Sequence, residues 1–527
     1  MDLFKYTAHE LHEKLVNKEI TAVELTNAVY ARIEEVDEQV NAYISLSKEE
    51  ALAQAEKVDA KIAAGEAIAP LAGIPVVFKD NININGQVTS CASKMMHGVS
   101  TIFDAHATEQ LRKEDAVFLG KANMAEFSIG NTTDNSFYGA AHNPWNLACT
   151  TGGCATAAAV AAGEAIWALA SDTSGDLRQP AAYAGCVGIK PTYGRVSRLG
   201  LAAYASSMDQ IGAVTKDVTD AATVLNAICG KDFRDSTSWE VETPDFTKAL
   251  VADVKGLRIG VPKEYFGANV DAKIKAEVEK AIEQYKAMGA EIVEVSMPHT
   301  EYAVRTFYVV ANGEAGANFA RYDGVRYGYR NMEAQTASEM TARSRDEGFG
   351  EEVKLRLMFG THVLSKGYYE NYYVRAMKVR TLIRNDFEEA FKQCDVLLTP
   401  TTPVLAEAYN TEMDAFAKYE LDFTTVTANL AGLPAITVPC GFVDGMPVGM
   451  QLIGKVLDEA TILKAAYTFE QATDFHPLSK ISRRTLQDVQ YQHDIRGIPL
   501  LSGIDSRTSR LAIPDCRKQC RRPSCHS

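Results

Sequence analysis

Apolar residues recur every three or four positions in three segments of the first 66 residues. Each segment follows a Ser or Thr that has a Glu three residues later, at Thr7/Glu10, Thr21/Glu24 and Ser47/Glu50. This spacing lets each side chain accept a hydrogen bond from the other residue's backbone N–H at the start of a helix. The pattern therefore predicts that residues 1–66 form a helical cover of the same domain.

From residue 67 onward, short apolar runs alternate with helical patterns. We expect strands at 71–78, 116–119, 257–261, 290–295, 396–400, 435–439 and 450–454, and helices at 106–113, 221–228, 271–288, most of 301–394 and 459–473. Such alternation is typical of an α/β fold in which helices cover the faces of a sheet. No internal repeat or Gly/Ser-rich linker divides the chain, so residues 67–479 are predicted to form one core.

The composition is that of a globular protein, with 46% hydrophobic and 23% charged residues. A formal net charge of −14 argues against a dedicated nucleic-acid-binding protein, which usually needs a basic face. The chain opens with a polar amphipathic helix rather than a signal peptide, and its most apolar run is too short to span a bilayer. Since the ten cysteines suggest reduced thiols rather than a disulfide framework, we expect a cytoplasmic protein.

The segment 480–527 differs from the rest of the chain. It has ten Lys and Arg against four Asp, about +6 in charge, and little apolar periodicity. A zinc site could be built from Cys516, Cys520, Cys525 and His526. Their spacing does not repeat the usual Cys-x2-Cys pattern, so we expect a basic, disordered tail instead, with tRNA as a candidate contact.

The stretch 143–201 has the features of a catalytic floor. A glycine turn at 152–153 precedes an alanine run at 157–162, and a polar turn at 171–176 lies between apolar segments. The buried strand expected upstream ends at Lys79, and a buried ammonium is costly unless it is paired. The chain lacks Gly-x4-Gly-Lys-Ser/Thr, His-Glu-x-x-His and Gly-x-Ser-x-Gly motifs, which argues against ATP, zinc-protease and α/β-hydrolase sites.

Several motifs resemble those of the amidase signature family: 73–81 (GIPVVFKDN), the glycine turn, 171–173 (SDT), 178–180 (RQP) and 188–192 (GIKPT). The resemblance extends from near the N-terminus to about residue 478. It implies an α/β fold in which a single domain has a mixed β-sheet core covered by helices on both faces. Within the family, 194–198 (GRVSR) and 206–212 (SSMDQIG) are most similar to the A subunits of glutamyl-tRNA(Gln) amidotransferases.

This resemblance implies a glutaminase that works in a heterotrimer. Such a protein releases ammonia from glutamine and passes it to a partner, so that Glu-tRNA(Gln) becomes Gln-tRNA(Gln). The implied partners are glutamine, a B-like and a C-like subunit, and, through the complex, Glu-tRNA(Gln). ATP and Mg²⁺ would be used by a partner subunit, and no cofactor or metal is expected in this chain.

The family reaction uses a Ser-Ser-Lys relay, in which a neutral lysine draws a proton through a bridging serine from a nucleophilic serine. Lys79 matches the lysine, and backbone N–H groups of Thr173, Ser174 and Gly175 match the oxyanion hole. The nucleophilic serine is the last residue of the family's Asp-Thr-Gly-Gly-Ser run. Here that position is Asp176.

The bridging serine is missing as well. The family's Gly-Gly-Ser-Ser-Gly-Gly-Ser run is two residues shorter in this chain, so its alignment has two solutions. Counting back from the alanine run puts Gly152 at the bridging position, whereas a gap inside the loop puts Cys154 there. Neither solution leaves a serine.

These replacements predict an impaired or inactive amidase. Asp176 beside Lys79 would form an ion pair and favour the charged lysine, although the relay needs the neutral amine. Ser174 also replaces a glycine whose conformational freedom the oxyanion hole would use. The alternative is rescue, with Cys154, Ser174 or Thr173 acting as the nucleophile.

The predicted glutamine pocket keeps its residues. The resemblance places a carboxylate clamp at Arg356, an ammonium partner at Asp422 and a lining residue at Tyr308, and these groups suit an α-amino acid. Without the resemblance, the arginine and the aspartate would be surface charges. Two other functions stay open: a non-catalytic glutamine-binding or scaffold subunit, and a stand-alone amidase of other specificity.

Overall fold

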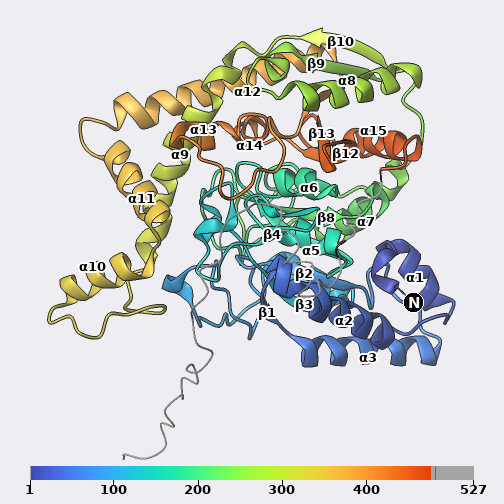
Figure 1. Ribbon diagram of the computed structural model, residues 1–527, viewed down its shortest axis with the longest axis horizontal. Helices are drawn as coiled ribbons and strands as arrows, with labels where there is room; N and C mark the ends of the chain where they lie inside the picture. Colours follow the sequence, from blue (N-terminus) through green and yellow to red (C-terminus); the bar gives the residue numbers. More distant parts are fainter. Residues whose placement is uncertain (1, 476–480, 482–527) are drawn as a thin grey trace, which may run out of the picture. The chain divides into compact units, whose positions relative to one another are not determined.

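The computed structural model describes residues 2–475 and 481, which build a large mixed β-sheet flanked by helices (Figure 1). The order of the eleven strands is β1 (Tyr43–Leu46), β3 (Val117–Ala122), β2 (Pro75–Lys79), β6 (Trp167–Asp172), β8 (Gln210–Thr215), β7 (Val187–Lys190), β12 (Ala435–Val443), β13 (Met446–Ile453), β11 (Val396–Pro400), β9 (Arg258–Pro262) and β10 (Glu291–Val295). β2 is parallel to β3 and β6, and β9 is parallel to β10 and β11. The other neighbours pair antiparallel. The predicted α/β fold with a mixed sheet is confirmed.

A two-stranded ribbon and a set of helices complete the described part of the chain. The ribbon pairs β4 (His142–Asn143) with β5 (Asn146–Thr150). The helices are α1 (Ala8–Val16), α2 (Ala22–Val40), α3 (Lys48–Ala64), α4 (His106–Lys113), α5 (Thr156–Ala162), α6 (Arg178–Ala184), α7 (Val218–Ile228), α8 (Ala272–Ala287), α9 (Ala303–Asn318), α10 (Ala337–Gly348), α11 (Glu351–Leu364), α12 (Arg375–Gln393), α13 (Ala415–Glu420), α14 (Val426–Ala431) and α15 (Glu459–Gln471). Within residues 2–475, none of these helices combines the length and the hydropathy needed to cross a membrane.

Two of the three predicted capping boxes are present. Thr7 and Thr21 each exchange both expected hydrogen bonds with the glutamate three residues later. Ser47 precedes α3 without a side-chain cap. There Glu50 instead accepts hydrogen bonds from Gln87 and Arg112, so its carboxylate faces neighbouring elements rather than the start of its own helix.

The N-terminal segment is not only helical. β1 pairs antiparallel with β3 at one edge of the sheet, a strand that the helical patterns of residues 1–66 did not predict. At the other end of the chain, the predicted tail 480–527 lies, apart from residue 481, outside the described residues. The same holds for the zinc alternative at Cys516, Cys520, Cys525 and His526.

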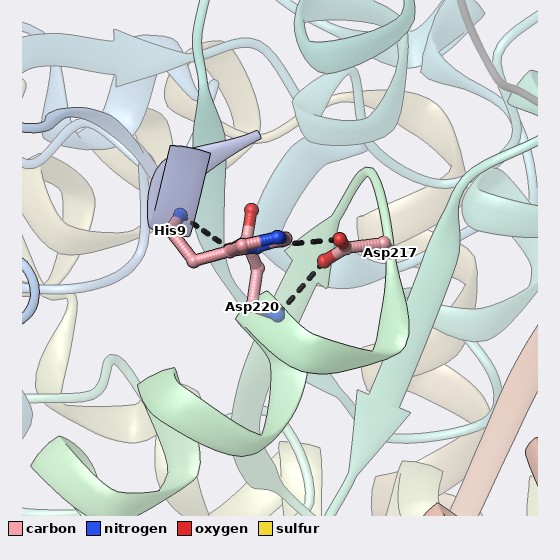
Figure 2. Close-up of side chains that lie close together, drawn as sticks. All are labelled: His9, Asp217 and Asp220. Atoms are coloured by element: carbon pink, nitrogen blue, oxygen red, sulfur yellow. Dashed lines mark hydrogen bonds and ion pairs between the residues drawn. The ribbon is translucent and has the colours of Figure 1, made fainter. Parts of the chain in front are cut away.

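A charged cluster holds α1 against α7 (Figure 2). His9 Nδ1 lies 2.9 Å from Asp220 Oδ1 and 3.4 Å from Asp217 Oδ2, and Asp220 also accepts hydrogen bonds from the N–H groups of Ala8 and His9. Burial lowers the pKa of His9, but the hydrogen bond with Asp220 and the charge of Asp217 outweigh it and raise that pKa to about 9. The three side chains lie close enough to ligate a metal ion. Their hydrogen bonds already account for the cluster, which we interpret as a helix-docking contact.

Candidate active site

The candidate site lies at the carboxyl ends of two neighbouring parallel strands, β2 and β6. β2 ends at Lys79 and β6 ends at Asp172, and the strands run side by side with Phe78 opposite Leu169. Both strands are fully buried, and polar side chains gather at their carboxyl ends, where α/β sheets commonly bind ligands. The turn after β6 leads into α6 and brings Asp176 back toward Lys79.

Lys79 and Asp176 form a buried ion pair at this edge. Lys79 Nζ lies 3.4 Å from Asp176 Oδ2 and donates a hydrogen bond to the carbonyl oxygen of Ser171 at 3.1 Å. The two side chains are 0% and 4% exposed, so water does little to stabilise either charge. Burial raises the pKa of Asp176 to about 6 even though the charge of Lys79 lowers it. The ion pair expected from the sequence is therefore present, and its carboxylate is poorly stabilised.

A second buried ion pair holds the same turn. Arg178 donates to Asp172 through Nε at 2.9 Å and Nη2 at 3.0 Å, and Nη2 also donates to Asn429 Oδ1 at 2.6 Å. Nη1 donates to the side chain of Gln451 and to the carbonyl oxygen of Thr425. Burial raises the pKa of Asp172, but the charge and hydrogen bonds of Arg178 dominate and lower it to about 2. This pair fixes the turn that carries Asp176.

The turn keeps its glycine where the backbone requires one. Gly175 has φ +136°, and a Cβ there would lie 2.3 Å from Thr425 Oγ1. Ser174 has no positive φ, so its side chain does not conflict with its own backbone, contrary to the expectation that glycine's freedom is needed there. The Thr425 hydroxyl donates to the carbonyl oxygen of Ser174, and the Thr173 hydroxyl donates to Asp209. The three predicted oxyanion residues thus lie in a turn that side-chain hydrogen bonds hold in place.

The two solutions for the bridging position differ in space. The Cys154 thiol donates a hydrogen bond to the carbonyl oxygen of Asp176 at 3.0 Å. A side chain on Gly152 would instead meet Pro180, with its Cβ 3.0 Å from the proline Cγ. Of the two predicted positions, only Cys154 hydrogen-bonds to the residue at the nucleophile position.

Gly153, which the sequence alternatives did not include, faces the carboxylate most directly. A Cβ on this residue would lie 3.0 Å from Asp176 Oδ1. The shortened loop therefore leaves a glycine, rather than a proton-relaying hydroxyl, beside that oxygen. Burial raises the pKa of the Cys154 thiol, although the charge of Lys79 lowers it, so the thiolate is disfavoured.

The three predicted glutamine-binding residues lie close together. Arg356 on α11 and Tyr308 on α9 stack with 4.2 Å between the guanidinium carbon and the ring centroid. The Tyr308 hydroxyl donates to Asp422 Oδ2 at 2.9 Å. Arg356 and Asp422 are 3% and 6% exposed, so the alternative that they are surface charges is wrong.

The charge of Asp176 acts on one of these three residues, Asp422. Burial and, to a smaller extent, the negative charge of Asp176 raise the pKa of Asp422 to about 7, although the hydrogen bond from Tyr308 lowers it. Asp422 and Asp176 are therefore close enough for their charges to interact.

Two pocket residues were missed in the sequence. Glu352 accepts a hydrogen bond from Arg356 Nε at 2.6 Å, and the Tyr419 ring covers the guanidinium with 4.3 Å from its centroid to the guanidinium carbon. The four-residue spacing of Glu352 and Arg356 in a predicted helix is a signal that could have identified the first contact. A cavity of about 490 Å³ opens here and is lined by Asn131 and Lys418 among others.

Known proteins resemble this chain in sequence and in fold. The model of the family described as Amidase matches residues 24–463. The chain is 51% identical over 481 residues to the A subunit of the glutamyl-tRNA(Gln) amidotransferase of Desulforamulus reducens, with 90% of this chain and 99% of the relative covered. It is 49% identical over 479 residues to the protein of the same name from Heliobacterium modesticaldum, with 90% and 98% covered.

Solved structures share the architecture. The A subunit of the glutamyl-tRNA(Gln) amidotransferase of Thermotoga maritima is 36% identical, with a TM-score of 0.76 over 91% of this chain and 99% of that one. The peptide amidase of Stenotrophomonas maltophilia is 28% identical, with a TM-score of 0.77 over 90% and 99%. The described fold is thus shared by amidases of different substrates.

Proposed function

Because the chain belongs to the amidase family, as its motifs predicted, we propose that it is the glutamine-binding A subunit of a glutamyl-tRNA(Gln) amidotransferase and that its glutaminase activity is impaired. Relatives of that name match it at 49–51% identity over almost their whole length, which supports the family role. The observation that carries the impairment is the buried ion pair between Lys79 and Asp176, the residue at the nucleophile position.

The chemistry of this pair opposes amide hydrolysis. A carboxylate is a much weaker nucleophile toward an amide carbon than an alkoxide, and the neighbouring anion favours the charged form of the lysine. Removing a single nucleophile typically abolishes most of an enzyme's acceleration. Rescue by Cys154 is disfavoured because burial raises the pKa of its thiol. Binding of glutamine does not require the lost groups, and Arg356 and Asp422 lie together in the pocket.

The partners follow from the family role. The proposed complex contains a B-like and a C-like subunit, acts on Glu-tRNA(Gln) and is cytoplasmic, and a partner subunit rather than this chain uses ATP and Mg²⁺. In it, the chain would bind glutamine without turnover or act as a scaffold. The arginine and carboxylate in the pocket suit an α-amino acid and argue against a stand-alone amidase of other specificity.

The test is reversion of the reaction centre. We expect ammonia release from glutamine by the complex to be near background, and to rise at least about a hundredfold in Asp176→Ser combined with one of three second changes, Gly152→Ser, Gly153→Ser or Cys154→Ser. The second change that succeeds identifies the bridging position. Asp253→Ser, at an exposed residue, is the matched control. Ammonia release by the unaltered complex at the rate of an active relative would refute the impairment.

Calorimetry separates the remaining roles. Binding of glutamine by the full chain without ammonia release supports the glutamine-binding role. An absence of glutamine binding, with the partner subunits still co-purifying, would leave only a scaffold. Ammonia release from other amides by the chain alone, without co-purifying partners, would favour the stand-alone amidase.

A further inference from the structure

We infer that Glu352 is a positioning residue that aims Arg356 at the carboxylate of the bound ligand. The inference rests on the proposed function, since it concerns the same glutamine pocket. Glu352 and Arg356 lie one turn apart on α11, with Arg356 Nε 2.6 Å from Glu352 Oε1. Arg356 is almost fully buried, whereas the side chain of Glu352 is 30% exposed.

The surroundings of the guanidinium leave its two Nη groups for a ligand. The Tyr308 and Tyr419 rings both contact it, at centroid distances of 4.2 and 4.3 Å, and they lie on the same side of it because their own centroids are 4.6 Å apart. Its Nε–H donates a hydrogen bond to Glu352 Oε1. The Tyr419 hydroxyl lies 3.4 Å from the same oxygen. Within the described residues, the two Nη groups have no hydrogen-bond partner, so they are the donors available to a carboxylate.

The helix that carries the pair is itself anchored beside the reaction centre. The carboxylate of Glu126 accepts a hydrogen bond from the N–H of Gly350, the residue preceding α11. The N–H of Ala125, the residue before Glu126, donates to the carbonyl oxygen of Gly153, which faces Asp176. The base of α11 is thus tied to the reaction centre, and the remaining freedom of Arg356 lies in its long side chain, which Glu352 restrains.

Glu352 has two opposite effects on a ligand carboxylate, which its variants can separate. Its negative charge repels the ligand, while its hydrogen bond holds the guanidinium plane so that both Nη groups can bind in parallel. Fixing a side chain before binding reduces the ordering that binding must cause. If positioning dominates, a glutamine side chain at 352 should largely replace the glutamate, because its amide oxygen also accepts a hydrogen bond.

The test measures the binding of L-glutamine, its α-carboxamide and glutarate by calorimetry on the full chain. We expect Glu352→Ala to weaken L-glutamine and glutarate about tenfold and to reduce the preference for glutamine over its α-carboxamide. Glu352→Gln should stay within about threefold of the unaltered protein. Glu388→Ala, which changes a 64% exposed glutamate on α12, is the control.

Each outcome bears on the inference. Unchanged or tighter binding by Glu352→Ala overturns the inference and leaves the proposed function intact. Equal loss of binding in the Ala and Gln variants also overturns it, because the hydrogen bond to Arg356 would then not determine the affinity. If the unaltered protein binds glutarate but not glutamine, the proposed function fails and the same variant series on glutarate still tests the positioning role. If it binds neither ligand, both are refuted.

Discussion

Two buried ion pairs lie on the same turn, and they differ in how completely each charge is satisfied. Arg178 binds Asp172 through two N–H groups at 2.9 and 3.0 Å, and two buried amide side chains complete the arrangement. Lys79 reaches Asp176 through one contact of 3.4 Å. The pKa of Asp172 is lowered to about 2, because Arg178 outweighs the effect of burial. The pKa of Asp176 is raised to about 6, because burial outweighs the effect of Lys79.

This difference indicates that the Arg178–Asp172 pair, the framework pair, is structural, whereas the Lys79–Asp176 pair is not needed to hold the turn. A buried carboxylate with several strong donors is a structural unit, whereas one whose charged partner is 3.4 Å away is only partly compensated for the loss of water. The first pair therefore maintains the turn, and the second places a carboxylate at the predicted nucleophile position. The turn can keep its fold whichever group occupies position 176, because Arg178 and Asp172 hold it.

The largest expected effect is on stability and comes from the framework pair. Arg178→Met should reduce the free energy of unfolding by about 4 kcal/mol, because it leaves Asp172 buried without its partner. Lys79→Met should cost only about 1 kcal/mol at pH 7, because a carboxyl group with a raised pKa takes up a proton readily. Urea unfolding followed by tryptophan fluorescence compares them, with Arg384→Met, at an exposed arginine, as the control. Equal losses for the two variants would remove the distinction between the pairs.

The two carboxylates should also give opposite pH dependences. Asp172 has a lowered pKa when folded, so its contribution to stability is present above pH 3.8 and is lost as the pH falls toward about 2. Asp176 has a raised pKa, so its contribution is present below pH 3.8 and is lost as the pH rises through about 6.

Asp176→Asn therefore tests this sign directly. Its stability relative to the unaltered protein should increase between pH 4 and pH 7 by up to about 3 kcal/mol, the size of a two-unit shift. Asp172→Asn should show no such increase over the same range. Urea midpoints at half-unit intervals of pH provide the measurement. A flat difference for Asp176→Asn would mean that its carboxylate is better stabilised than the geometry indicates.

The framework was predictable from the sequence because it depends on local patterns. Apolar runs identified seven of the eleven strands of the sheet, although not β1, β6, β7 or β8, and Thr7 and Thr21 identified two helix starts. The proximity of Lys79 and Asp176 followed from the family motifs that contain them, and the structure confirms it. The roles of these residues in catalysis and in glutamine binding stay predictions.

What the sequence did not predict depends on partners that lie far away in the chain. Ser47 lacks its cap because Glu50 binds side chains from other elements. Gly153 was overlooked because a loop shortened by two residues changes which position faces the carboxylate, and counting residues cannot fix that direction. The four-residue spacing made Glu352 a possible partner of Arg356, but the burial of that arginine is revealed only by the packing of Tyr308 and neighbouring residues.

The smallest expected effect belongs to a double variant that removes both charges of the Lys79–Asp176 pair, and this variant tests the comparison most sharply. Replacing a poorly satisfied buried ion pair with apolar side chains is often neutral or stabilising, so Lys79→Met with Asp176→Leu should stay within about 1 kcal/mol of the unaltered protein in urea unfolding. The same treatment of the framework pair, Arg178→Met with Asp172→Leu, should cost about 3 kcal/mol or more, because buried amide groups then lose their partners. If both double variants were equally stable, the hydrogen bonds around Arg178 would contribute nothing, and the two pairs would differ only in geometry.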